Sequence, residues 1–418
     1  MPPKRCLHAM PSCWPCSAGS SGCDRLPQSH PALRVQDPQT GGYVRRPGDG
    51  RKQPDIRASV LLWAQVIGYL LREASFLAIE KLSKSGVGRG LGIARKFGND
   101  ALGYFTERLD PERTRQALAQ VLERAKRNKV FDDGHLIGLA LDGTGVGHSA
   151  KKRCKLCRPY CNSKKEIIAY AHRVVVITVV SSGITLPLDA EPYGPGDCEY
   201  RAGQRLLARA VKRLGKRFAD YLVVDGEFAT APFLHAAHEV GLHVVARFKD
   251  NLPELLGQAQ KRFENTPPLL TFQEGPDFIE LWEADDFDPW ETLQWKTVQV
   301  FRYRQHKPDG TIIEAYWLTD LSTRRVGLRR LYAIAKSRWE IENEVFNDAK
   351  NRYGFERIPH HHANSLLLHW LLIFLALWIE GLYRLRYLHR GKHPPIAAMD
   401  LLRRLRRAMS SPAVLDTS

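Results

Sequence analysis

The sequence lacks an apolar run long enough to cross a bilayer. Its longest run, residues 366–379, spans 14 residues, contains His369 and is followed by Glu380, whereas a membrane-spanning helix needs about 20 apolar residues. Near the N-terminus, proline, serine and glycine interrupt the apolar stretch that a signal peptide would require. We therefore expect a buried core helix at 366–379 and a cytoplasmic protein.

Several catalytic patterns are also missing. The sequence contains no fixed-period repeat, no glycine-rich phosphate-binding loop and no convincing Ser/His/Asp or Cys/His nucleophile arrangement. Acidic residues are too few to balance the basic ones: 45 Asp and Glu oppose 62 Lys and Arg, which leaves a net charge of +17. Because such a charge favours a polyanionic partner, nucleic acid is the leading candidate and an acidic membrane the second.

Composition and periodicity divide the chain into six segments. Residues 1–57 contain nine Pro and six Gly and no apolar periodicity, which predicts a disordered N-terminal extension. Apolar residues at helical spacing in 58–135 predict a helical domain whose basic character suits DNA contact, although a merely solvated face is equally compatible. The remaining segments are the two parts of an α/β core (136–250 and 323–382), a β insertion (251–322) and a basic C-terminal tail (383–418).

The first part of the core alternates between β-rich and helical stretches. The order is β-β-β-α-β-α-β, which predicts a mixed sheet flanked by helices. The first strand, 136–141, is expected to end in a turn that begins with Asp142, and the strand at 221–224 is followed by Asp225.

The insertion is marked by its charge. Residues 263–295 hold nine acidic side chains and no Lys or Arg, so we do not expect this surface to lie against DNA. Alternating apolar and polar residues at 298–303 and 312–318, separated by a Pro-Asp-Gly turn, predict two paired strands.

Three carboxylates are the candidate chemical centre: Asp142, Asp225 and Glu342, the last on a helix expected at 326–352. Ends of adjacent strands gather side chains from distant parts of a chain. Three carboxylates in one place repel unless protons or divalent cations neutralise them, and oxygen ligands suit Mg²⁺ or Mn²⁺. Two such ions would clamp the attacking and leaving oxygens of a phosphodiester exchange. Taken singly, however, Asp-Gly after a strand is a common turn.

The helix around Glu342 carries a more specific pattern. The segment reads Arg338-Trp339-Glu340-Ile341-Glu342-Asn343-Glu344, and Arg338 lies one helical turn before Glu342. It resembles the C-terminal signature of DDE transposases from bacterial insertion sequences, in the insertion-sequence-four-like branch. The resemblance covers residues 58–380 and implies an RNase H-like fold with Mg²⁺ bound by Asp142, Asp225 and Glu342. It also implies that Arg338 and Lys350 hold DNA phosphates.

The segment departs from the family pattern in two places. The expected Tyr falls on Ala335, with Tyr332 nearest, and seven residues rather than six separate Glu342 from Lys350. Glu344 therefore stays an alternative third acid. Relatives can stack a flipped base on an aromatic residue of the insertion, for which the candidates are Trp290, Trp295 and Trp317, although we expect core packing as the role of each before base stacking.

A basic loop with cysteines follows the first strand. Residues 151–165 hold seven basic and no acidic side chains, so we expect DNA backbone contacts from Lys151, Lys152, Arg153 and Lys155. Cys154 and Cys157 form a possible zinc half-site that Cys161, His148 or His172 would complete. The N-terminal set of Cys6, Cys13, Cys16 and Cys23 is a weaker candidate, and the triplet His360, His361 and His362 is expected to face solvent or cap neighbours.

The resemblance implies a transposase that cuts and joins DNA. Its partners would be the terminal inverted repeats of an insertion sequence and the target DNA, bound by a homodimer associated with the bacterial nucleoid, with no membrane partner. Two alternatives stay open: an inactive relic that only binds DNA, and a nuclease of the same fold that hydrolyses without joining.

Overall fold

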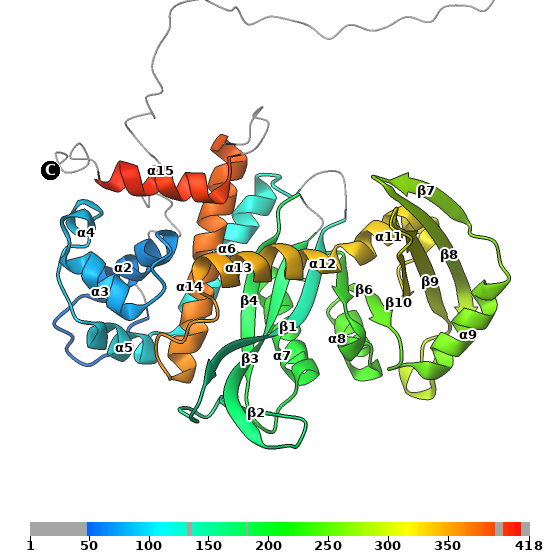
Figure 1. The fold of residues 1–418 in the computed structure, drawn as a ribbon, viewed down its shortest axis with the longest axis horizontal. Helices are drawn as coiled ribbons and strands as arrows, with labels where there is room; N and C mark the ends of the chain where they lie inside the picture. Colours follow the sequence, from blue (N-terminus) through cyan, green and yellow to red (C-terminus); the bar gives the residue numbers. More distant parts are fainter. Residues whose placement is uncertain (1–47, 132–135, 181–182, 389–395, 411–418) are drawn as a thin grey trace, which may run out of the picture.

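One mixed sheet runs through the molecule (Figure 1). The computed structural model describes residues 48–131, 136–180, 183–388 and 396–410, so most of the extension expected at 1–57 lies outside the described residues. The strand order is β2-β3-β1-β5-β6-β10-β9-β8-β7, with β4 paired to β3. The strands are β1 (Gly138–Ser149), β2 (Arg158–Cys161), β3 (Ile167–Val180), β4 (Leu186–Tyr193), β5 (Tyr221–Val224), β6 (His243–Phe248), β7 (Leu270–Glu274), β8 (Asp277–Phe287), β9 (Val298–His306) and β10 (Ile312–Thr319).

The central part of the sheet mixes both pairing directions. β1 pairs antiparallel with β3 and parallel with β5, and β5 pairs parallel with β6. All four residues of β5 are buried, as are most of β6, because helices cover both faces of a parallel pair. The predicted α/β class, an RNase H-like mixed sheet flanked by helices, is confirmed.

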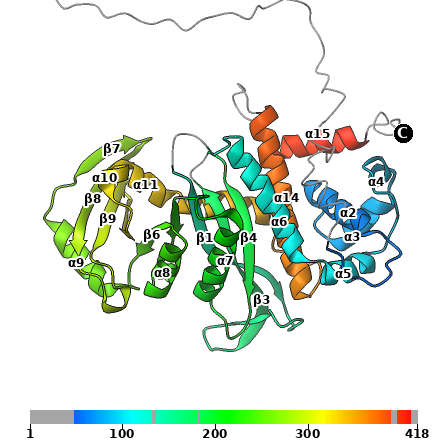
Figure 2. The ribbon, with the colours of Figure 1, turned by 180° about the vertical axis from the view of Figure 1, so that it is seen from behind.

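Helices lie on opposite faces of this sheet. On one face are α7 (Glu199–Leu214) and α8 (Ala231–Glu239), which are in front in Figure 2. Across the other face runs a chain of short helices, which is in front in Figure 1. Its members are α11 (Leu328–Lys336), α12 (Arg338–Glu340), the π-helix η3 (Ile341–Phe346) and α13 (Asn347–Tyr353).

The long helix α14 (Ala363–Tyr383) lies between the sheet and the first four N-terminal helices (Figure 1), whereas the fifth, α6 (Pro111–Arg127), also packs on β4 and α7. By length and composition, residues 363–388 would suffice to cross a membrane, but 72% of the apolar window is buried inside the protein. α14 packs on β4 and on three N-terminal helices, as a core helix does. The N-terminal helices are α2 (Ala58–Leu70), α3 (Phe76–Lys84), α4 (Gly86–Gly90), α5 (Asn99–Arg108) and α6 (Pro111–Arg127); η4 (Arg384–Leu388) and α15 (Ala398–Ser410) follow α14.

The first strand corrects the sequence prediction. β1 does not end before Asp142 but continues to Ser149, and Asp142 pairs with Val176 inside the β1–β3 ladder. The Asp-Gly pair resembles a turn locally, but β3 is long enough to pair with β1 along the whole strand. Asp142 is therefore held by a strand, which fixes its side chain more firmly than a turn would.

The insertion extends the central sheet. It begins with α9 (Pro253–Glu264), and its last strand, β10, pairs antiparallel with β6. The acidic residues 263–295, for which the sequence predicts only a surface that avoids DNA, form β7, β8 and a short 3₁₀ helix η2 (Glu291–Leu293). A short helix α10 (Thr323–Val326) leads back to the core.

Candidate active site

Asp142 lies at the centre of an acidic cluster on β1. Asp142 is only 9% exposed, and the backbone N–H of Gly143 donates to Asp142 Oδ1 at 2.8 Å. Burial raises the pKa of Asp142 to about 8; the carboxylates of Asp225 and Glu342 raise it as well, whereas the guanidinium of Arg338 acts in the opposite direction. The three predicted acids are therefore near enough to act on one another.

Asp225 comes directly after β5, as predicted. Because β5 is the parallel neighbour of β1, the chain leaving β5 lies beside the middle of β1. The half-buried Asp225 caps the short 3₁₀ helix η1 (Gly226–Phe228), and its Oδ1 accepts the backbone N–H of Glu227 at 2.9 Å. Backbone geometry thus fixes this carboxylate without using both of its oxygens.

Glu342 comes from the opposite side, on the π-helix η3 that packs across β1, β3 and β4. Nη1 of Arg338 donates to Glu342 Oε1 at 2.7 Å and lies 3.7 Å from Asp142 Oδ2. Arg338 is 4% exposed, and its buried Nε has no hydrogen-bond partner among the described residues. One guanidinium therefore stands between two of the three acids.

The π-helix accounts for the unusual spacing in this segment. A π turn holds more residues than an α turn, and single π turns inside α-helices often occur at functional sites. The additional residue between Glu342 and Lys350 is taken up by this turn, so that α13 continues the helix beyond it.

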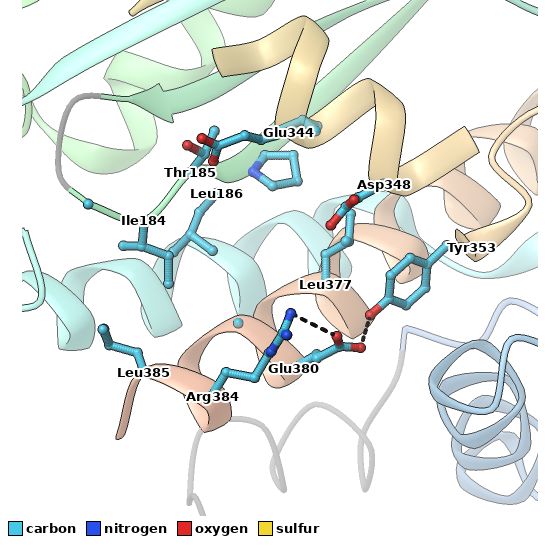
Figure 3. A pocket seen from close by; sticks show the side chains of 14 residues that line it. Ile184, Thr185, Leu186, Glu344, Asp348, Tyr353, Leu377, Glu380, Arg384 and Leu385 are labelled. Atoms are coloured by element: carbon cyan, nitrogen blue, oxygen red, sulfur yellow. Dashed lines mark hydrogen bonds and ion pairs between the residues drawn. The ribbon is translucent and has the colours of Figure 1, made fainter. Parts of the chain in front are cut away.

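Glu344, the alternative third acid, lies elsewhere. It lines a pocket together with Thr185, Asp348 and Glu380, between the start of β4 and helix α14 (Figure 3). Arg338 contacts Glu342 and not Glu344. The structure therefore brings Glu342 to Asp142.

A further acid, missed from the sequence, lies near Asp225 on the face of β1 opposite to Asp142. Glu199, the first residue of α7, has its carboxyl carbon 2.2 Å from where a Cβ on Gly143 would stand. Tyr193 donates its hydroxyl to Glu199 Oε2 at 2.8 Å. Burial raises the pKa of Glu199, and the carboxylates of Glu227 and Asp225 add to this effect. An acid at a helix N-terminus is common for dipole reasons alone, so no sequence signal singled it out.

This donor set suits a hard divalent cation. The residues around Asp142 offer carboxylate oxygens, the ligands that Mg²⁺ and Mn²⁺ prefer, and a bound cation would offset the burial and the repulsion that together raise the Asp142 pKa. Asp142 and Glu342 now flank the guanidinium of Arg338. In the described part of the chain, a group of three or more His, Cys, Asp or Glu residues that could hold a metal ion occurs only at a Cys/His cluster. The ligand atoms of that cluster all lie within 4.8 Å of one another.

The predicted DNA-contact residues fall into two groups. Lys151, Lys152, Arg153 and Lys155 are exposed on the loop between β1 and β2. Arg338 is buried as described above. Lys350 pairs with Glu356 at 3.3 Å and is partly buried.

Arg173 is a basic residue that the sequence did not single out. It lies exposed on β3 opposite Gly145 of β1, and its guanidinium carbon is 3.8 Å from where a Cβ on Gly145 would stand. It is also near enough to Glu199 to lower the pKa of that acid. Arg173 therefore offers positive charge at the edge of the acidic cluster.

The three insertion tryptophans differ in position. Trp317 is fully buried in β10 and stacks on Phe301, and Trp295 stacks on His238 with ring centroids 4.8 Å apart. Trp290 is half-buried and lines a surface pocket that also contains Glu199 and Gly226. Of the three, Trp290 is therefore the one that shares a pocket with Glu199.

The residues at the expected tyrosine position serve packing. Ala335 is fully buried, and Tyr332 donates its hydroxyl to Glu274 Oε2 of β7 at 2.7 Å. Tyr332 thereby joins α11 to the insertion and not to the acids.

The cysteine loop gathers a second cluster, made of Cys154, Cys157, His172 and His361. The alternatives Cys161 and His148 are exposed and lie outside it. His361, which was expected to face solvent or cap neighbours, lies in this cluster beside the cysteine loop. His362 does cap α14, accepting from the backbone N–H of Asn364, and the N-terminal cysteines lie outside the described residues.

One protein-family match covers most of the chain. The transposase DDE domain family matches residues 134–379, more than half of the chain. Among solved structures, the chain is similar to a piggyBac transposase synaptic complex with hairpin DNA, determined by cryo-EM. The TM-score is 0.45 at 12% identity, and the match covers 87% of this chain and 75% of that one. No curated protein matches the chain.

Proposed function

The chain belongs to the transposase DDE domain family, and we propose that it is a DNA transposase of the insertion-sequence-four-like branch. It cleaves the ends of an insertion sequence and joins them to target DNA by phosphoryl transfer. The observation that supports this proposal is that Asp225 and Glu342, from parts of the chain far apart in the sequence, both come near Asp142, with Arg338 between Asp142 and Glu342.

Asp142, Asp225 and Glu342 are the residues that would hold Mg²⁺ or Mn²⁺. When bound, these ions would activate water or a 3′-hydroxyl and stabilise the charge that develops on the phosphate. Asp142 is fixed by its strand and Asp225 by its cap, whereas Glu342 stands on a π turn with its side chain 43% exposed. We infer that Arg338 keeps Asp142 and Glu342 from repelling each other before the cations arrive.

The exposed basic residues around the acids would hold the DNA backbone. Lys151, Lys152, Arg153 and Lys155 reach solvent from the loop after β1, and Arg173 does so from β3. Phosphate contacts of this kind position DNA without reading its sequence. Arg338 and Lys350 now engage Glu342 and Glu356, and would have to exchange these partners for phosphate.

A labelled duplex with the element's terminal inverted repeat, together with a target plasmid, tests this function. With Mg²⁺, the wild-type protein should nick the repeat end and join the freed 3′-hydroxyl to the plasmid, while Asp225→Asn should bind the duplex without cutting it. Nicking without joining would identify a nuclease. Binding without nicking in any divalent cation would identify a DNA-binding relic. We propose a homodimer on paired ends, acting at the bacterial nucleoid, and expect cross-linked dimers only when DNA is present.

A further inference from the structure

We propose that Cys154, Cys157, His172 and His361 bind a structural zinc ion, which ties the basic loop to the segment between α13 and α14. Nothing in the acidic cluster takes part in this site, and the proposal does not depend on the function proposed above. The four residues come from three segments: the loop between β1 and β2, the strand β3, and the connection that enters α14.

The distances within the cluster match a tetrahedral zinc site. With Zn–S bonds of about 2.3 Å and Zn–N bonds of about 2.05 Å, a tetrahedron has edges of about 3.8 Å between sulfurs and about 3.6 Å between sulfur and nitrogen. The two sulfurs are 3.7 Å apart, and His172 Nε2 lies 3.2 and 3.6 Å from them. All four ligand atoms lie within 4.8 Å of one another.

The cysteine loop has a conformation suited to holding metal. The backbone N–H of Cys157 donates to the carbonyl of Cys154 at 3.2 Å, which closes the turn between the two cysteines. The turn leaves the two sulfurs 3.7 Å apart.

Protein hydrogen bonds alone do not explain this arrangement. Nδ1 of His361 is buried without a hydrogen-bond partner in the described part of the chain, and Nε2 of His172 faces the two sulfurs. The protein thus places two imidazoles against two thiols and leaves a buried nitrogen of His361 with no protein partner, which is costly unless another ligand completes the site.

A disulfide does not fit, because the 3.7 Å between the sulfurs far exceeds the roughly 2.05 Å of an S–S bond. Four protein ligands and no open position also distinguish a structural site from a catalytic one. Two thiolates would balance the charge of Zn²⁺, so the site would be electrically neutral beside a strongly basic loop.

The test is the zinc content of the purified full-length chain, measured by inductively coupled plasma mass spectrometry. We expect about one zinc ion per chain in wild type. Cys154→Ser and His361→Ala should lose at least four fifths of it. Three control variants should keep it: His362→Ala beside the proposed ligand, Cys161→Ser on the same loop, and Cys13→Ser/Cys16→Ser in the N-terminal set.

Cobalt substitution of the wild type gives a readout that does not depend on variants folding. We expect the intense visible bands of tetrahedral Co²⁺ together with thiolate charge-transfer absorption, both lost on adding excess Zn²⁺. The proposal is overturned if the wild type takes up neither ion, if His361→Ala keeps its zinc, if Cys13→Ser/Cys16→Ser loses it, or if mass spectrometry finds Cys154 and Cys157 joined in a disulfide.

Discussion

Arg338 and Asp142 meet in the interior of the site: Nη1 of Arg338 lies 3.7 Å from Asp142 Oδ2, and both side chains are almost fully buried. The same nitrogen donates to Glu342, so one guanidinium interacts with two acids. Breaking a buried ion pair by removing one partner leaves an uncompensated charge in a poorly solvated place. Replacing Arg338 therefore tests how far its positive charge stabilises the two acids.

We expect Arg338→Met to destabilise the fold and to make it depend on divalent cations. The loss should be about 3 kcal/mol, and Mg²⁺ should recover more stability in the variant than in wild type, because the cation replaces the missing guanidinium. Denaturant unfolding with and without Mg²⁺ measures both. Arg127→Met removes an exposed pair with Glu123 and should change stability by no more than about 1 kcal/mol, with no Mg²⁺ dependence. An equal Mg²⁺ response in both variants would refute the argument.

Gly143 must lack a side chain because Glu199 occupies the space. A Cβ there would stand 2.2 Å from the Glu199 carboxyl carbon, so Gly143→Ala should cost about 1–3 kcal/mol by overpacking. Gly143→Ala/Glu199→Ala should recover most of that loss. The matched control is Gly145→Ala on the same strand, where the nearest atom is 3.8 Å away and little change is expected. Thermal unfolding of wild type, these variants and Glu199→Ala alone measures this coupling, and strictly additive losses would show that it is absent.

Trp290 and Trp317 should respond differently to replacement by alanine. Trp317 is fully buried, so Trp317→Ala should destabilise the fold by about 3–5 kcal/mol. Trp290 lines the pocket beside Glu199, so Trp290→Ala should weaken binding of the terminal repeat by about 1–3 kcal/mol in free energy, as loss of base stacking does, with little effect on stability. Fluorescence anisotropy with labelled DNA measures the change in binding, and denaturant unfolding measures the change in stability. Unchanged DNA affinity in Trp290→Ala would leave Trp290 as a packing residue.

His369 makes stability depend on pH. It is buried in α14, accepts the Tyr69 hydroxyl at Nδ1 and contacts the Gly354 carbonyl, and burial lowers its pKa to about 4 from the usual 6.5. Between these values the unfolded chain binds a proton that the folded chain does not, so stability falls as the pH drops from 6.5 towards 4. The contribution is about 3 kcal/mol at most. His369→Asn should be less stable at neutral pH but should lose less stability on acidification, which unfolding curves at several pH values will show. Parallel losses in both proteins would contradict this.

Local sequence signals predicted those parts of the site that depend on local structure. The strand before Asp225 was placed at the bounds observed for β5, and Arg338 and Glu342 were predicted to share a helix face, as their hydrogen bond shows. The continuation of β1 beyond Asp142 was not predicted, because an Asp-Gly pair favours a turn unless a long neighbouring strand pairs with it.

The positions of Glu199 and His361 could not be predicted because they depend on tertiary contacts. Glu199 comes to Gly143 through the packing of α7 against β1, and His361 reaches Cys154 because η3 and α13 run across the sheet before the chain enters α14. Glu199 lies in no motif that would mark it, and the histidine triplet gives no local reason to place His361 at the cysteines. The π-helix was likewise visible in the sequence only as an irregular spacing between Glu342 and Lys350.

The central claim is that three acids share divalent cations, and anomalous scattering from crystals soaked in Mn²⁺ tests it most directly. We predict anomalous peaks contacted by carboxylate oxygens of Asp142, Asp225 and Glu342, and their loss in Asp142→Asn with the fold preserved. Peaks held by Glu344 instead, or no peak near Asp142 at saturating Mn²⁺, would contradict the account.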